Sequence, residues 1–392
     1  MKQLYRALLV LLTLCAAREG RCQGTWATDS SNGFSSVAEA GSCIFNGKIY
    51  IIGGAYDPGF DIFSQAVQIF NPVTHIWIQG PSLPISSTYP SCNALNGKIY
   101  AFVADSNSDG SATVEIFDSA TNAWSAGPRM PIARYGQGSA VIGGKIYLIG
   151  GYKDSSVDVF DPVTETWSTA PHLPAPRSYF ASCAVGGKIY VMGGFGIGEH
   201  NGLLDSVVIF DSATNAWSAG PSMPGALTDC SASFLDGKIY VMGGIDDSKT
   251  LDIFDTFTNI WSIGPNMLIA RSDLVSDAIN GKIYAIGGTD NTGAAVSVNV
   301  NEVFTPGPLG VAEGGAAPAG SALRVFPNPA SGVLQIMGGQ PGTAHLFDLM
   351  GREALTPSPL PMGEGSLDVS HLLPGTYFLR LGGQSAKVEI AR

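Results

Sequence analysis

The residues of this chain that could do chemistry are scattered along it. Five histidines stand at positions 75, 172, 200, 345 and 371, and the last two belong to a C-terminal tail. A zinc or copper site needs several ligands that converge on one point, and this spacing predicts none. The glycine-rich stretch 194–198 resembles a phosphate-binding loop, but no helical pattern follows it. We therefore expect no cofactor and no catalytic residue.

One short segment carries oxygen side chains at the spacing of a calcium loop. Asp105, Asn107 and Asp109 alternate with serines and are followed by Gly110. A calcium loop needs a bidentate carboxylate at its twelfth position, which here is Ile116. The sequence favours a solvated turn, and leaves these three residues as the metal candidates.

Side chains suited to recognition stand in several variable, polar segments. They comprise aromatic residues, arginines, carboxylates and a histidine: Tyr56, Asp57, Phe60, Arg134, Tyr135, Tyr152, Arg177, Tyr179, His200, Asp246, Arg271 and Asp273. Aromatic rings beside such polar groups suit a sugar or a protein surface, and variable loops on a rigid scaffold are where recognition usually resides. The arginines have an alternative role, which is to join neighbouring structural units through ion pairs.

A repeated phrase shows which elements must position these side chains. Gly-Lys-Ile-Tyr occurs six times, with its tyrosines at positions 50, 100, 147, 190, 240 and 284, so that they are 43 to 50 residues apart. A period of this length fits one four-stranded blade of a β-propeller.

Each repeat has the same internal order. A strand of small residues is followed by a tight turn such as Asn46-Gly47, and then by the Lys-Ile-Tyr strand, which usually ends in Gly-Gly. Asn-Gly favours the positive φ values of a two-residue hairpin. A third strand ends in a hydrophobic residue and Phe, and a Trp opens the fourth.

The tryptophans predict how the ring closes. Five of the six follow the third strand of successive repeats, whereas Trp26 precedes the first repeat and the sixth repeat has none. We therefore expect residues 24–28 to supply the outermost strand of the last blade, which would leave only short strand edges exposed.

These motifs resemble the kelch repeat over residues 24–305. The resemblance implies a six-bladed propeller around a central channel, in which the repeated Tyr, Trp and Gly serve packing. Blade 2 departs from the pattern, because Val103-Ala104 replaces Gly-Gly. Since propeller strands alternate in direction, the loops between second and third strands share one face with the loops that join blades. These loops vary, and the turns of the opposite face are nearly constant.

Composition and the N-terminus indicate export. The formal net charge is −11 and no basic stripe exists, so a nucleic-acid partner is not expected. Residues 1–23 read as a signal peptide, and no later apolar run is long enough to span a membrane. Secretion permits disulfides, and the sequence leaves open whether Cys43, Cys92, Cys183 and Cys230 are paired or free.

The tail has a different character. Residues 306–322 are rich in Pro, Gly and Ala, which is typical of a linker, and residues 323–392 show the alternation of a small β-sandwich. Motifs at 325–329, 347–352, 373–379 and 387–388 resemble the C-terminal sorting domain of the type IX secretion system of Bacteroidetes. The resemblance implies that the type IX machinery is a partner and that the tail is removed or anchored after export.

We thus expect an all-β protein, a six-bladed kelch-like propeller followed by a small C-terminal β-sandwich. Its expected function is that of a secreted or cell-surface binding protein that presents a loop-rich face to a protein or glycan. The alternatives are a sugar-modifying, epimerase-like enzyme with its site at the channel mouth, and a structural part of a surface layer.

Overall fold

The computed structural model describes most of the repeat region and much of the tail. The described residues are 24–29, 31, 33–57, 62–104, 112–197, 202–245, 248–290, 296–307, 324–326, 333–337, 342–348, 351–355, 358–360, 365–381 and 384–391. The predicted signal peptide, nearly all of the linker and the three calcium candidates lie outside these residues, as do Phe60, His200 and Asp246.

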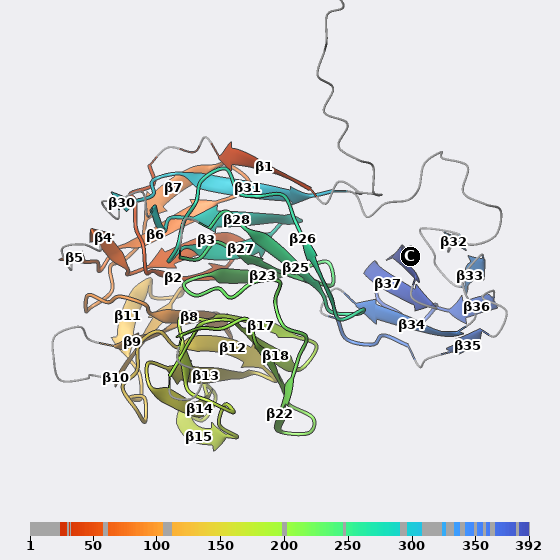
Figure 1. Ribbon diagram of the computed structural model, residues 1–392, viewed down its shortest axis with the longest axis horizontal. Helices are drawn as coiled ribbons and strands as arrows, with labels where there is room; N and C mark the ends of the chain where they lie inside the picture. Colours follow the sequence, from red (N-terminus) through yellow and green to blue (C-terminus); the bar gives the residue numbers. More distant parts are fainter. Residues whose placement is uncertain are drawn as a thin grey trace, which may run out of the picture.

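Six four-stranded antiparallel sheets form the repeat region (Figure 1). Blade 1 is β2 Gly41–Phe45, β3 Lys48–Ile52, β6 Val67–Asn71 and β7 Ile76–Gln79; blade 2 is β8 Ser91–Leu95, β9 Lys98–Ala104, β10 Ala112–Asp118 and β11 Ala123–Ala126. Blade 3 is β12 Gly138–Ile142, β13 Lys145–Gly151, β14 Asp154–Asp161 and β15 Thr166–Ala170; blade 4 is β17 Ala181–Val185, β18 Lys188–Met192, β21 Val207–Asp211 and β22 Ala216–Ala219. Blade 5 is β23 Ser231–Leu235, β24 Lys238–Met242, β25 Leu251–Asp255 and β26 Ile260–Ile263; blade 6 contains β27 Val275–Ile279, β28 Lys282–Ile286 and β31 Asn301–Pro306.

The N-terminal strand completes blade 6. β1 Gly24–Asp29 pairs antiparallel with β31, and Trp26 lies opposite Phe304. Phe70 and Trp77 have the same pairing in blade 1. The first strands of the blades contact one another in cyclic order, and β2 touches both β8 and β27. The prediction of a closed ring sealed by residues 24–28 is therefore confirmed.

The repeated tyrosine and tryptophan join one blade to the next. Each Gly-Lys-Ile-Tyr tyrosine packs on the third-strand phenylalanine of the following blade, with ring centroids between 5.4 Å (Tyr284–Phe70) and 6.3 Å (Tyr50–Phe117) apart. Five tryptophan Nε1–H groups donate to a proline carbonyl in the preceding blade: Trp26 to Pro265, Trp124 to Pro81, Trp167 to Pro128, Trp217 to Pro171 and Trp261 to Pro221. These indoles are half-buried, and each gains both packing and a directional bond from its place between two blades.

The hairpin turns on the constant face have the predicted geometry. Asn46 and Gly47 have φ values of 48° and 71°, and Asn96-Gly97, Asp236-Gly237 and Asn280-Gly281 repeat this arrangement. The four propeller cysteines, Cys43, Cys92, Cys183 and Cys230, are free thiols in the inner strands or immediately before them. Burial raises the pKa of the Cys183 and Cys230 thiols to about 12, which keeps both protonated at neutral pH.

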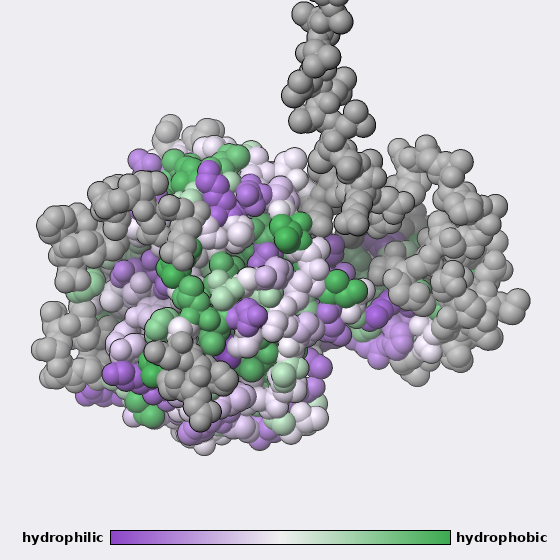
Figure 2. All heavy atoms as spheres, in the orientation of Figure 1, coloured by the Kyte–Doolittle hydropathy of each residue, from purple (hydrophilic) through white to green (hydrophobic). Residues whose placement is uncertain are grey.

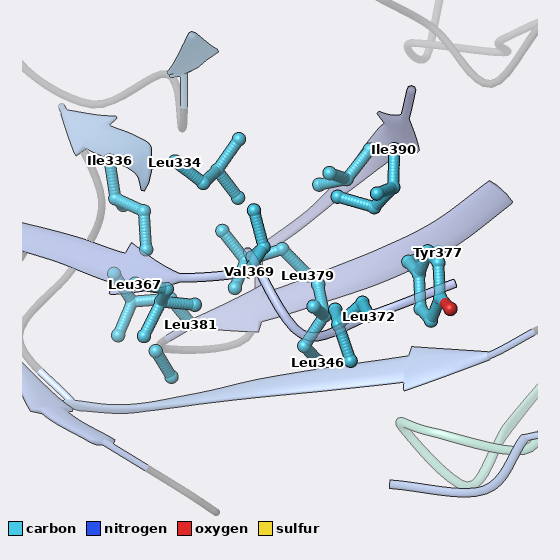
Figure 3. Close-up of a cluster of buried hydrophobic side chains, with 12 residues drawn as sticks. Leu334, Ile336, Leu346, Leu367, Val369, Leu372, Tyr377, Leu379, Leu381 and Ile390 are labelled. Atoms are coloured by element: carbon cyan, nitrogen blue, oxygen red, sulfur yellow. The ribbon is translucent and has the colours of Figure 1, made fainter. Parts of the chain in front are cut away.

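The tail folds into two small sheets around a core of its own. One sheet contains β32 Arg324–Phe326, β33 Val333–Met337 and β36 Gly365–Asp368; the other contains β34 Gly342–Asp348, β35 Ser358–Leu360, β37 Gly375–Leu381 and β38 Gln384–Ile390. Leu334, Ile336, Leu346 and Leu379 are among the apolar side chains buried between them (Figure 3). The two small sheets confirm the small β-sandwich predicted from the alternation of residues 323–392, whereas no strand was predicted at β35 and β36.

The tail lies against the constant face of the propeller. The Arg380 Nη1 donates to the Phe257 carbonyl at 2.6 Å, and the Phe257 and Phe347 rings are 5.0 Å apart. Phe257 lies in the turn between β25 and β26. The loop strands β4, β5 and β30 project from the other end of the propeller (Figure 1). The variable face therefore points away from the tail.

Candidate functional site

The loops of the variable face form small sheets of their own. β4 Ala55–Asp57 pairs with β5 Ile62–Phe63, β29 Thr289–Asp290 pairs with β30 Val296–Ser297, and β19 Phe195–Gly196 lies between β16 Arg177–Ser178 and β20 Gly202–Leu203. Ser297 Oγ donates to the Tyr56 carbonyl at 2.8 Å, which ties the loop of blade 6 to that of blade 1. These contacts give the face ordered structure around the channel.

One backbone position is repeated at the entrance of the channel. It lies two residues before the first strand of each blade and has a φ between 48° and 63°: Glu39, Tyr89, Gly136, Tyr179, Asp229 and Asp273. Five of these are not glycine, although a left-handed conformation costs such residues about 1 kcal/mol or more. Backbone hydrogen bonds join neighbouring members, for example Glu39 N to Asp273 O at 3.0 Å and Asp229 N to Tyr179 O at 2.9 Å. We call these six residues the mouth ring.

The mouth ring encloses a cavity of about 120 Å³. Each ring residue lines it together with the residue that follows: Ala40, Pro90, Gln137, Phe180, Cys230 and Leu274. Among the described residues, this wall has three carboxylic acids and three aromatic rings, and it contains no lysine, arginine or histidine. On the face of the molecule that Figure 2 shows, the described surface mixes small groups of hydrophobic residues with hydrophilic ones.

The carboxyl groups of the ring are held by hydroxyls and by one another. Tyr89 OH donates to Asp273 Oδ1 at 2.8 Å, Ser272 Oγ donates to Asp273 Oδ2 at 3.0 Å, and Thr88 Oγ1 donates to Glu39 Oε2. The carboxyl of Asp229 bonds that of Asp273. Desolvation and the charge of Asp273 raise the pKa of Asp229 to about 8, and desolvation also raises the pKa of Asp273. The pair therefore shares a proton at neutral pH.

A row of tyrosines leads from the cavity onto blade 3. Tyr89 meets Tyr179 edge-on at 5.0 Å, Tyr179 lies 6.4 Å from Tyr135, and Tyr135 stacks on Tyr152 at 5.2 Å. Tyr135 and Tyr152 are 42% and 39% exposed, and Lys153 Nζ lies 5.0 Å from the centre of the Tyr152 ring. The row thus has a half-buried end at the mouth and an exposed end that can stack on a planar or apolar ligand surface.

Comparisons with known proteins agree with this architecture. The model of the KLHDC2/KLHL20/DRC7 Kelch-repeats domain matches residues 23–194 and 91–288. The chain belongs to the kelch-repeat family. A stretch of 66 residues is 38% identical to a putative F-box/kelch-repeat protein of Arabidopsis thaliana, and spans only 17% of this chain and 17% of that protein. The solved structure of YjhT covers 69% of this chain and 95% of its own, with a TM-score of 0.60 and 18% identity, which shows a common fold alone.

The tail of this kelch protein also has a match. The model of the secretion system C-terminal sorting domain covers residues 324–390. The protein is therefore a kelch propeller with a type IX sorting domain, and it is secreted or exposed at the cell surface. In the described ranges no helix is long and apolar enough to cross a membrane.

The three candidate arginines have a structural role in the kelch propeller, and the alternative role expected for them needs a correction. Arg134, Arg177 and Arg271 are at most 5% exposed, and none lines the cavity. Each guanidinium donates to two strand-end carbonyls of its own blade, as Arg271 does to Gly287 and Val300. Within the part of the chain that the structure describes, the arginines therefore brace single blades and form no ion pairs between neighbouring ones. The three arginines are therefore not part of the cavity wall.

Each arginine stands four residues before the first strand of its blade, and comparing this position between blades shows which blades have a complete ion pair. Arg134 bonds Asp158 and Arg271 bonds Glu302 at 2.6 Å, both acids standing two residues before the third-strand phenylalanine. In blade 4 this place is Val208, and Arg177 bonds Ser206 Oγ instead. Blade 5 has the acid, Asp252, but Leu227 stands at the arginine position. Desolvation raises the pKa of Asp252 to about 6.

The remaining candidates are distributed as follows. Tyr135, Tyr152, Tyr179 and Asp273 come together at or beside the mouth, whereas Tyr56 is 39% exposed on the loop of blade 1. Asp57 ends β4. The sequence reasoning missed Glu39, Tyr89 and Asp229. They occupy the position of Tyr179 and Asp273 in other repeats, so aligning the repeats at this point would have found them.

Metal binding has no support in the described residues. Among them, no group of three histidine, cysteine or acidic side chains is arranged to hold a metal ion. The calcium candidates Asp105, Asn107 and Asp109 lie outside the described residues. What the described wall of the cavity offers is carboxyl groups and hydroxyls beside aromatic faces.

Proposed function

We propose that this kelch protein is a secreted or cell-surface binding protein that recognises a glycan through the loop-rich face of its propeller. The observation that carries the proposal is the tyrosine row, which leads from exposed, stacked rings at Tyr135 and Tyr152 to the carboxyl-lined cavity. Flat aromatic surfaces suit the apolar faces of sugar rings, and nearby carboxylates accept hydrogen bonds from sugar hydroxyls. A protein ligand is the other class of partner that such a surface suits.

The position of the tail supports this use of the variable face. The sorting domain contacts the turn at Phe257 on the constant face, so attachment through the tail would leave the mouth ring open to the surroundings. A ring of six blades also gives the loops a rigid base, which lowers the entropy that is lost on binding.

The test is a glycan array with the full mature chain, followed by isothermal titration of the glycans that bind. The Tyr152→Ala variant removes an exposed ring of the row, and we expect it to weaken binding about tenfold. Val163→Ala is the matched control, since Val163 is 80% exposed in a constant-face turn of the same blade. Equal affinities for both variants and the wild type, or no glycan bound at all, would refute the proposal.

One observation favours a second function, that of a sugar-modifying enzyme. A carboxyl pair that shares a proton near neutral pH can act as a general acid or base, as Asp229 and Asp273 could at the cavity wall. This candidate is tested by incubating the full chain with the glycans that bind and following their anomeric and epimeric forms by NMR. Turnover that Asp229→Asn abolishes would support the enzyme; binding without turnover would support the binding protein.

A further inference from the structure

We propose that the mouth cavity binds the ammonium group of an unacetylated amino sugar within the glycan. The inference rests on the proposed function and adds the class of ligand to it. Its basis is the juxtaposition, in one small cavity, of three carboxylic acids, an unpartnered buried acceptor and aromatic rings.

The wall of the cavity has the charge that attracts a cation. Glu39, Asp229 and Asp273 line it, and no lysine, arginine or histidine among the described residues shares the wall. Even with one proton held between Asp229 and Asp273, that pair retains a negative charge. The net charge of the whole chain, −11, adds a long-range field of the same sign.

Gln137 gives an independent indication of a donor-bearing ligand. It is 9% exposed and lines the same cavity. Its Nε2 donates to the Phe102 carbonyl at 3.4 Å, which fixes the amide orientation and makes Oε1 the free atom. Gln137 Oε1 has no hydrogen-bond partner in the described part of the chain. An unpaired buried acceptor is costly, and an ammonium group brings three N–H donors.

The aromatic residues favour an amino sugar over the lysine of a protein partner. Tyr89, Tyr179 and Phe180 line the cavity, and aromatic faces attract a desolvated ammonium. The tyrosine row continues outward to Tyr135 and Tyr152, which offers stacking surface for further sugar rings beside the first. A narrow lysine side chain would leave these outer rings unused.

The test compares two trisaccharides that differ only in acetylation. The full mature chain is titrated at pH 6.5 with the β-1,4-linked trimer of glucosamine and with the same trimer fully N-acetylated. We expect the amine form to bind at least about tenfold more tightly. Raising the salt concentration should weaken the amine form alone.

Two variants with the same net charge locate the effect. Glu39→Gln alters the cavity wall, whereas Glu165→Gln removes one acid from an exposed turn on the constant face. We expect Glu39→Gln to weaken binding of the amine form about tenfold and Glu165→Gln to leave it unchanged. Circular dichroism melting of each variant shows whether it is folded.

The outcomes separate this inference from the function on which it rests. Equal affinity for the two trimers would overturn the ammonium site and leave glycan binding in place. Binding of lysine-rich peptides without binding of the amine trimer would overturn it in favour of a protein partner. If neither trimer binds, the inference fails, and the glycan array decides the proposed function separately.

Discussion

Tyr89 OH donates a 2.8 Å hydrogen bond to Asp273 Oδ1, although the two residues are 184 positions apart in the chain. Tyr89 precedes the first strand of blade 2 and Asp273 precedes that of blade 6, so the bond joins the two blades that flank blade 1. It links the tyrosine row to the carboxyl pair. We therefore expect a ligand that shifts the Tyr89 hydroxyl to alter the hydrogen bonding of the Asp273 carboxyl as well.

The carboxyl pair predicts a dependence of stability on pH. The pKa of Asp229 is about 8 in the folded protein and about 4 in an unfolded chain, because burial and Asp273 disfavour its charged form. Stability that is present below the unfolded value is lost as the pH rises through the folded value. We expect the free energy of unfolding to fall by about 3–4 kcal/mol between pH 5 and pH 8, measured by urea denaturation.

The Asp229→Asn variant is the control for this prediction. Since asparagine does not titrate, the variant should have a flatter profile than the wild type over the same range. A wild-type profile that rises from pH 5 to pH 8, or one that Asp229→Asn leaves unaltered, would mean that the pair does not share a proton.

The presence of the arginine in blade 3 and its absence from the same position of blade 5 predict opposite effects on stability for the substitution of two buried aspartates. Asp158 accepts from Arg134, so Asp158→Asn leaves the buried guanidinium with only the more distant Asp154, at 3.5 Å, and should destabilise the protein by about 2 kcal/mol. Asp252 has no arginine at the matching position, and burial raises its pKa to about 6. Asp252→Asn should therefore stabilise the protein by about 1–2 kcal/mol at pH 7.

The benefit of Asp252→Asn should disappear as the pH falls. Below about pH 4 the aspartate is protonated in both the folded and the unfolded chain, so that its burial no longer carries a charge penalty. Chemical denaturation at pH 4 and pH 7 measures both differences. If both variants are destabilised at pH 7, the presence or absence of the arginine partner does not decide whether these acids stabilise the fold.

Ring closure predicts that Trp26 contributes to the stability of the whole propeller. Trp26→Phe keeps a ring against Phe304 but removes the 2.8 Å bond from Nε1 to the Pro265 carbonyl. We expect a loss of about 1–2 kcal/mol in urea denaturation. Thr25→Ser, at an exposed position of the same strand, should have no effect. A Trp26→Phe variant as stable as the wild type would mean that the ring does not depend on this bond.

The sorting domain predicts where a truncated protein accumulates. A chain that ends at residue 322 retains the whole propeller but lacks the matched region 324–390. Immunoblots of cell fractions and culture medium should find the full chain outside the cell or on its surface, and the truncated chain inside. Export of the truncated chain in equal amount would contradict the role of the tail.

Much of the fold could be predicted from the sequence because the repeats impose the same local chemistry six times. Asn46-Gly47 and its equivalents set the hairpins, and the single displaced Trp26 identifies the closing strand. The order of the blades then follows from chain connectivity. The role of Trp26 was predictable since a packing position that is empty in one repeat must be filled by another segment.

The site was less predictable, because it is made by a backbone position and not by a motif. Glu39, Tyr89 and Asp229 share little as residue types, and only their common distance from the first strand brings them to one cavity. The arginines show the opposite case. Arg177 is conspicuous in the sequence, yet its guanidinium donates to Gly193 and Ser206 in its own blade. Side-chain direction and hydrogen-bond partners are not contained in a one-dimensional pattern.

Hydrogen exchange of the full chain with and without its best-binding glycan tests the central claim most directly. Slower exchange should be confined to amides of the mouth ring and of the tyrosine row, including Glu39, Tyr152 and Asp229, because a ligand there excludes water and reduces local opening. Slower exchange at the constant-face turns or in the tail, with the mouth ring unaffected, would contradict the claim that this kelch propeller binds at its channel mouth.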